Sequence, residues 1–340
     1  MDTITHALSG ALIARATAGD RTGALPVGMR MLAGAAAAAF PDADIVVRAF
    51  GALPYLDAHR GITHSLVMLP FWSIALAWVF SRIAREHHRW QAFVAVAALG
   101  IAIHIAGDVI TAWGTMIYAP LSDRRVAFAT TFIIDPIFTA IIVAGLIAAW
   151  RIPAQRRIAP AALVLLVGYI GAQTWLRSEA MTIGNHYASS NALVATSVVA
   201  LPQPLSPWRW KILVETDDAW REALVDLQRR APAPTPPPNA GWVARLDATY
   251  QSPGTLAWRR FAKYGDGTSR AIALAAWNDP ALAPYRRFAR FVVLDHLSEE
   301  NNGRTCVYFK DLRFTIAGRA PVFRYGACRP RTGSAWKLVS

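Results

Sequence analysis

Long apolar stretches without charge dominate the first half of the chain. Three of them, 61–81, 90–107 and 158–176, contain no charged residue, and a fourth, 126–150, contains only Asp135. A helix needs about 20 apolar residues to cross the hydrocarbon core of a membrane. The pattern therefore predicts a membrane-spanning helix in each of these stretches.

Two shorter apolar stretches come first, at 3–14 and 31–41. They are too short for full spans, so we expect short, tilted or re-entrant helices that pack against protein rather than lipid. Tryptophans mark the ends of the longer stretches, as in an interfacial aromatic belt: Trp90, Trp113, Trp150 and Trp175. Residues 1–178 are thus expected to form an α-helical polytopic membrane domain with about four to six transmembrane or re-entrant helices.

The second half of the chain, residues 179–340, has the pattern of a soluble α+β domain. Helical spacing predicts a helix over 217–230, and the Pro-rich segment 231–240 is expected as a linker or long loop. Apolar, partly β-branched segments predict strands at 195–201, 208–214, 242–250, 288–294, 305–309 and 321–325.

Composition supports this division into two domains. Charged residues make up 17% of the 340 residues, below the ~25% of an average soluble domain. Residues 1–178 hold 14 Arg, no Lys and 9 acidic residues, whereas 179–340 hold 21 Lys or Arg and 13 acidic residues. The net charge of +13 is spread over both halves and no basic run exceeds two residues. A nucleic-acid partner is therefore not expected.

The arginines predict the orientation of the chain in the membrane. If all six segments cross, nine arginines lie on one side and four on the other. The positive-inside rule places the larger set in the cytoplasm: Arg15, Arg21, Arg30, Arg82, Arg85, Arg89, Arg151, Arg156 and Arg157. The domain 179–340 is then expected outside the cytoplasm, in an oxidising compartment where a disulfide between Cys306 and Cys328 could persist.

Histidines and aspartates gather on one side of the expected membrane domain. They occur in five short signals: Thr5-His6, PDAD with Asp42 and Asp44, HRGITHS with His59 and His64, HIAGD with His104 and Asp108, and Asp135 before Pro136. With alternating crossings all of them fall on the extracytoplasmic side, whereas His87 and His88 fall in a cytoplasmic loop. Ionisable groups in or beside membrane helices are costly and mark functional sites.

These residue types point to metal chemistry, because imidazole nitrogens and carboxylate oxygens are ligands of zinc and similar divalent ions. His104 and Asp108 lie four residues apart, so on a helix both point from one face and can share an ion. His59 and His64 lie five apart, which requires a loop-to-helix junction. We expect a divalent-metal site, with zinc as the first candidate. The number of candidate ligands exceeds what one tetrahedral ion needs, so a second ion could also bind. The candidate ligands are His6, Asp42, His59, His64, His104 and Asp108.

Three other roles follow from the same segments. Asp44 or Asp42, if not bound to metal, could act as general base. Arg60, inside the HRGITHS motif, could bind the anionic part of a substrate or anchor to a headgroup phosphate. Asp135 could begin a helix or hold a histidine ligand.

The His/Asp signals also have plain structural explanations. Thr5-His6 could form a polar helix start, and Asp42 or Asp44 could cap a helix. A lone HxxxD pattern is more often a buried hydrogen-bonded pair than a metal site. His104, however, stands among apolar neighbours, where an imidazole loses its hydration and needs Asp108 or a metal ion as a partner.

Together the motifs resemble a known family. MDTITH with Gly10, PDAD, HRGITHS and HIAGD are similar to the YdjM-type inner-membrane metal-dependent hydrolases over residues 1–178, and the segment 204–210 is similar too. That family is grouped with zinc-dependent phospholipases C and related nucleases. The resemblance implies an inner-membrane location and, as ligands, His6, Asp42 or Asp44, His64, and His104 with Asp108. The remaining ligands of the soluble zinc phospholipases have no clear match, so a full three-metal site is not implied.

The expected function is therefore that of a membrane-bound, divalent-metal-dependent hydrolase. It would act on a phosphoester or ester at the outer face of the inner membrane, and a lipid or lipid-linked phosphoester is the first substrate class to consider. The alternative is a non-catalytic membrane protein whose His/Asp cluster binds metal or protons, or stabilises helix packing. Transport would need polar groups throughout the bilayer, whereas the inner halves of the expected spans are apolar.

Overall fold

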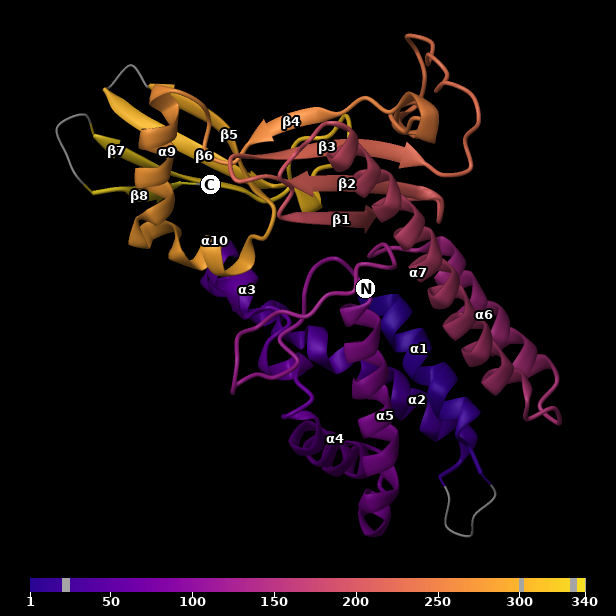
Figure 1. The fold of residues 1–340 in the computed structure, drawn as a ribbon. Coiled ribbons are helices and arrows are strands. Elements are labelled where there is room, and N and C mark those ends of the chain that lie inside the picture. The colour runs from indigo at the N-terminus through magenta and orange to yellow at the C-terminus, as the bar shows by residue number, and fades with distance from the viewer. Residues whose placement is uncertain (20–24, 300–302, 331–334, 340) are drawn as a thin grey trace. The chain divides into compact units, whose positions relative to one another are not determined.

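A computed structural model describes residues 1–19, 25–299, 303–330 and 335–339 (Figure 1). The chain divides into two compact units, Met1–Trp175 and Leu176–Ser340. The first unit is helical and the second contains two antiparallel sheets. Arg21, one of the arginines used to predict orientation, lies outside the described residues.

Helices of very different length build the first unit. In chain order they are α1 (Thr3–Ala16), α2 (Val27–Ala39), the 3-10 helix η1 (Phe40–Phe50), α3 (Ala52–Ala58), η2 (Ile62–His64), α4 (Leu69–Ile83), η3 (His87–Arg89), α5 (Trp90–Val109), α6 (Pro136–Arg151) and α7 (Ile158–Ser190). The last helix begins in the first unit and ends in the second.

Glycines allow α1, α2 and α5 to pack unusually closely, side by side (Figure 1). A Cβ on Gly10 of α1 would lie 2.2 Å from the carbonyl oxygen of Gly34 in α2, and one on Gly34 would lie 2.5 Å from that of Gly10. A Cβ on Gly100 of α5 would lie 2.8 Å from the Cβ of Ala37. Small residues commonly let membrane helices approach in this way. This packing holds the N-terminal end of α1 and the segment after α2 beside the C-terminal end of α5.

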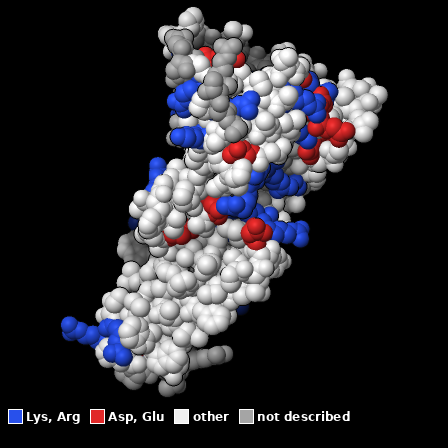
Figure 2. All heavy atoms as spheres, turned by 90° about the vertical axis from the view of Figure 1, so that its left-hand side faces the viewer, with Lys and Arg blue, Asp and Glu red and all other residues white. Residues whose placement is uncertain are grey.

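Two of the described helices, α5 and α7, are long and apolar enough to cross a membrane. A third span is obtained if a bent pair of helices is counted as one. That pair, Ala52–His64 and Leu69–Ile83, is bent by 79°. The helix expected over 61–81 thus begins only at Leu69, with Pro70 in its first turn, a favoured position for proline. On the face shown in Figure 2, much of the lower part of the surface carries no charged side chain.

The span expected over 126–150 is also shorter than predicted, because α6 starts at Pro136. Residues that precede a proline avoid the helical conformation, and Asp135 instead caps the helix. The chain before it bonds to the end of α5: the N–H groups of Phe128 and Thr130 donate to the carbonyls of Val109 and Ile110. This segment therefore closes over the end of α5 that carries His104 and Asp108.

The second unit contains two four-stranded antiparallel sheets. The first has the order β1 (Ser197–Pro202), β2 (Arg209–Glu215), β3 (Ala219–Asp226) and β4 (Arg259–Ala262), and the second the order β5 (Val292–Glu299), β6 (Arg304–Asp311), β7 (Arg324–Pro330) and β8 (Lys337–Val339). The remaining elements are α8 (Trp242–Asp247), η4 (Pro253–Thr255), α9 (Thr268–Asn278), η5 (Pro280–Leu282), α10 (Ala283–Phe288) and η6 (Leu312–Phe314). The α+β class expected from the sequence is confirmed.

Two of the predicted elements in this unit are wrong. The helix expected over 217–230 is the strand β3, which pairs with β2 on one edge and β4 on the other; both strand partners come from elsewhere in the chain. The strand expected over 242–250 starts as the helix α8. Leu246 of this helix and Tyr250, just after it, are buried together with Leu224 of β3.

Two buried contacts join distant segments of the second unit. Cys306 and Cys328 lie directly opposite each other on β6 and β7 and form a disulfide, as the sequence allowed. Lys211 of β2 reaches the turn after β6, where its Nζ donates to the carbonyl of Leu312 at 2.7 Å, and it pairs with Glu222 at 3.3 Å. Burial lowers the pKa of Lys211, and the Glu222 carboxylate opposes this shift.

Candidate metal centre

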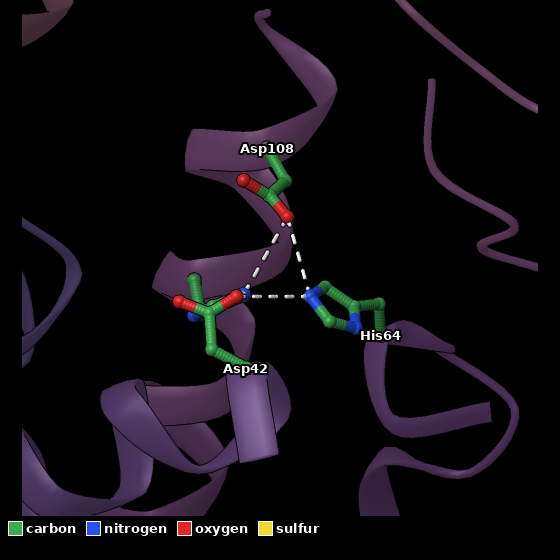
Figure 3. A group of neighbouring side chains, drawn as sticks. Asp42, His64 and Asp108 are labelled. Atoms are coloured by element: carbon green, nitrogen blue, oxygen red, sulfur yellow. Dashed lines mark ion pairs between the residues drawn. The ribbon is translucent and has the colours of Figure 1, made fainter. Parts of the chain in front are cut away.

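Four side chains from three segments meet at one end of the first unit. Asp42 lies near the start of η1, His64 ends η2, and His104 and Asp108 lie one turn apart on α5. One possible ligand atom from each lies within 4.8 Å of those of the others. Figure 3 shows the carboxylates of Asp42 and Asp108 and the imidazole of His64 pointing toward one another.

The donor atoms surround a common point. The Nε2 atom of His64 lies 3.3 Å from Oδ2 of Asp108 and 3.6 Å from Oδ1 of Asp42. The Nε2 atom of His104 lies 3.5 Å and 3.7 Å from the same two oxygens. His64, His104 and Asp108 are fully buried, and Asp42 is partly exposed. Two imidazoles and two carboxylates therefore form an enclosed set with one open edge at Asp42.

Neighbouring groups orient both imidazoles. Nδ1 of His104 lies 2.6 Å from the carbonyl oxygen of Ala38, an acceptor only, so this nitrogen carries the proton and Nε2 presents a lone pair. Nδ1 of His64 lies 3.0 Å from Oγ1 of Thr63. A ligating histidine usually bonds through its other ring nitrogen in this way.

The inner atoms of the cluster fit a cation. Nε2 of His64, Nε2 of His104 and Oδ2 of Asp108 are buried and have no hydrogen-bond partner in the part of the chain that the structure describes. Buried polar atoms without partners are costly and rare. A divalent ion among them would satisfy all three atoms, and two nitrogen and two oxygen ligands suit zinc or a similar ion.

His6, predicted as a ligand, lies beside this group rather than in it. Its Nε2 is 3.0 Å from Oδ1 of Asp108, the oxygen that faces away from the cluster, and its ring stacks on His104 at 3.7 Å between centroids. A Cβ on Gly107 would lie 3.1 Å from Cε1 of His6, so glycine makes room for the ring. The amino group of Met1 also contacts Oδ1 of Asp108. His6 thus holds a neighbouring carboxylate in place.

His59, the sixth predicted ligand, is also outside the four-residue group. Its Nδ1 bonds to Oδ1 of Asp44 at 2.8 Å, and its ring stacks on Tyr55. The other Asp44 oxygen accepts the backbone N–H of Arg60 at 3.0 Å. The sequence suggested Asp44 as a free general base. In the structure both of its oxygens are bonded, and it orients His59. The segment between the two histidines of HRGITHS turns at Arg60, whose φ is 62°, and Nε2 of His64 lies near Asp42 and Asp108 whereas His59 contacts Asp44.

Arg60 is buried, with 2% of its surface exposed. Its Nε lies 2.9 Å from Oδ2 of Asp108, and its Nη1 donates to Oγ1 of Thr111 at 2.9 Å. The guanidinium also lies over the ring of Trp113. Because Arg60 is held inside the protein, it does not anchor to lipid headgroups at the membrane surface. The other predicted role of Arg60, binding the anionic part of a substrate at the cluster, stays a prediction.

Asp135 has the structural role that the sequence left open. Its side chain accepts the N–H groups of Ile137 and Phe138 at 2.9 and 3.0 Å and the hydroxyl of Tyr169 at 2.8 Å. It is an N-cap, as is usual for aspartate. Asp42 accepts a further bond, at 2.6 Å from the hydroxyl of Thr3. Sequence reasoning missed Thr3 and Thr111; their spacing from His6 and Asp108, three residues in both cases, was the available signal.

A cavity of about 550 Å³ opens beside the cluster. Asp42, Tyr55, His59, Arg60 and Trp113 are among its lining residues. The cavity therefore connects one ligand of the candidate centre with the oriented histidine and the buried arginine. A small reacting group could lie there in contact with all three.

These features define a helical membrane protein with a buried His/Asp cluster that can hold a divalent ion. The family model of the YdjM inner membrane protein matches residues 1–180, and the chain belongs to this family. It is also similar to the uncharacterized protein YfhP of Bacillus subtilis (strain 168), with 33% identity over 176 residues. That match covers 50% of this chain and 52% of YfhP, so it spans about half of each protein. No solved structure matches.

Proposed function

We propose that the protein is a divalent-metal-dependent hydrolase of the inner membrane that cleaves a phosphoester or ester, with lipid-linked phosphoesters as the first substrate class. The observation that carries this proposal is the set of buried atoms on His64, His104 and Asp108 that form no hydrogen bond in the described part of the chain and lie close to Asp42, which lines a cavity. Membership of an inner membrane protein family supports the location.

The residues around the centre have distinct roles in this proposal. His64, His104, Asp42 and Asp108 would hold the ion, which supplies a lowered pKa for a bound water molecule and polarises the scissile group. Arg60 would bind an anionic oxygen of the substrate, since Arg60 is among the residues that line the cavity and a guanidinium pairs well with phosphate. His59, oriented by Asp44, also lines this cavity and would exchange a proton there.

The chemistry of the donor set favours hydrolysis. The four candidate ligands are nitrogen and oxygen donors, without cysteine, and such ligands suit hydrolytic ions better than soft redox metals. The sequence has no G-x-S-x-G motif for a serine nucleophile. His59 and Arg60, which line the cavity beside the cluster, favour hydrolysis over a cluster that only binds metal or stabilises helix packing.

The test uses the full chain, purified in detergent and loaded with zinc. We expect release of water-soluble, phosphate-containing product from mixed bilayer lipids, abolished by a chelator and by His104→Ala, and retained by His87→Ala. Circular dichroism of each variant shows whether its helices have formed. If folded, metal-loaded wild type cleaves no phosphoester or ester in a broad panel, the non-catalytic alternative becomes the better one.

A further inference from the structure

A second cavity lies against the same Asp42–Asp44 segment, and its chemistry is different. It also has a volume of about 550 Å³, and most of its lining is apolar: Phe40, Val46, Val47, Ile62, Trp72 and Met116. The cavity described above is lined instead by Asp42, His59 and Arg60. Ala43 lines both, so the polar and the apolar cavity meet at one residue of η1.

The apolar cavity extends to the edge of the candidate metal centre. Asp44 and Thr63 line it, and both contact His64. Oγ1 of Thr63 is 3.0 Å from Nδ1 of His64, and Oδ2 of Asp44 is 3.6 Å from the same atom. The side chains of Asp44 and Thr63 therefore separate the apolar cavity from His64. A molecule that reacts at the centre would have this apolar space beside its reacting group.

The rim of this cavity carries exposed apolar side chains beside the polar Ser122 and Asp123. Val46 is 68% exposed and Ile62 is 50% exposed, and Leu121, which follows the lining residue Pro120, is 79% exposed. Exposed apolar surface of this kind marks contact with a membrane or a partner. In a unit built around membrane-spanning helices, hydrocarbon chains of lipid are the medium that such a rim meets.

We propose that the apolar cavity binds the hydrocarbon chain of the substrate, so that the enzyme selects amphiphilic phosphoesters or esters that enter from the membrane. The reaction itself rests on the proposed function, whereas chain binding is a separate property of η1 and its neighbours. The reacting group would lie in the polar cavity beside Asp42 and Arg60. Contacts between the chain and the apolar lining would add to the binding of the headgroup, so long-chain compounds should bind better than short-chain ones.

Binding is tested without turnover, using hexadecylphosphonate and methylphosphonate, which carry the same headgroup and resist hydrolysis. The zinc-loaded full chain in lipid nanodiscs is dialysed against each compound, with empty nanodiscs as the reference for partitioning. After subtraction of what empty nanodiscs retain, we expect more hexadecylphosphonate than methylphosphonate to be bound by the protein. Val46→Trp, which fills the cavity, should lower this retention about tenfold.

Ala49→Trp is the matched control, because Ala49 lies on the same 3-10 helix and lines neither of the two cavities. This variant should retain hexadecylphosphonate as wild type does. Equal retention by wild type and Val46→Trp would overturn the proposal, as would equal loss in both tryptophan variants, since a general disturbance of η1 would then explain the result.

Turnover separates this inference from the proposed function. Hexadecyl 4-nitrophenyl phosphate and methyl 4-nitrophenyl phosphate share the scissile bond and differ only in the chain. We expect wild type to favour the hexadecyl compound in kcat/KM, and Val46→Trp to lose about tenfold of that preference while still cleaving the methyl compound. Cleavage of both compounds without preference overturns the chain cavity and leaves the hydrolase. Chain-dependent binding without cleavage of either compound leaves the cavity and overturns the hydrolase.

Discussion

At the scale of residues, the centre depends on how each donor is oriented by a neighbour. The carbonyl of Ala38 fixes the tautomer of His104, and Thr63 bonds the outer nitrogen of His64. His6 bonds the outer oxygen of Asp108. Such outer contacts determine where the inner lone pairs point, so they distinguish a ligand from a residue that supports one.

This distinction predicts a graded loss of metal. His64→Ala or His104→Ala removes a donor and should abolish tight binding of zinc. His6→Ala keeps all four donors and removes only a contact to Asp108, so it should weaken binding by about 10–100-fold. Elemental analysis of the purified protein and competition with a chelator measure both effects.

His87→Ala is the control, because His87 belongs to η3 and lies outside the cluster. It should bind zinc as wild type does. Equal zinc content in His64→Ala, His104→Ala and wild type would show that the cluster does not hold the ion.

At the scale of elements, close packing of three helices determines whether the donors meet. Asp42 follows α2, and His104 and Asp108 lie on α5. A displacement of α2 away from α1 would carry Asp42 with it. Gly34 is therefore expected to matter for the centre although it touches no ligand, and Gly28, on the same helix, has open space where a Cβ would lie.

The pair of glycines gives a matched test. Gly34→Ala would place a methyl group 2.5 Å from the carbonyl oxygen of Gly10, and such overpacking costs about 1–3 kcal/mol. We expect a lower melting temperature and weaker zinc binding, measured in the same detergent. Gly28→Ala should leave the melting temperature unchanged or raise it slightly, because alanine favours a helix over glycine. Equal behaviour of the two variants would contradict the packing argument.

At the scale of the whole molecule, the membrane unit and the sheet-containing unit are expected to have different surroundings. The disulfide between Cys306 and Cys328 joins β6 to β7 in the second unit, and disulfides persist in oxidising compartments. This bond agrees with the arginine distribution, which predicts that the C-terminal unit lies outside the cytoplasm.

A topology experiment tests the orientation. A reporter enzyme that is active only outside the cytoplasm should be active when fused after Ser340 and inactive when inserted in the loop 82–89. The physical reason is that the side of the membrane that holds the loop 82–89 carries the larger number of arginines and is therefore expected to be cytoplasmic. The reverse pattern of activities would overturn the predicted orientation, although the metal centre would be unaffected.

The sequence alone predicted a helical first half and an α+β second half, and its candidate ligands include the four residues of the candidate centre. Uncharged apolar stretches can be stable only in lipid or deep inside protein, so the helical first half and the polar α+β second half followed from composition and pattern. The four-residue spacing of His104 and Asp108 put both on one helical face. Asp42 and His64 were also recognised, because they belong to motifs expected on the same side.

Only the tertiary structure decided which of the six candidates share one point. His6 and His59 are the same residue type as His64 and His104, but their partners Asp108 and Asp44 come from segments distant in sequence. Contacts between distant segments also explain why 217–230, expected as a helix, contains the strand β3. This strand is stabilised by pairing with β2 and β4. Spacing along the chain encodes local periodicity, whereas contacts between distant segments depend on how the helices and strands pack.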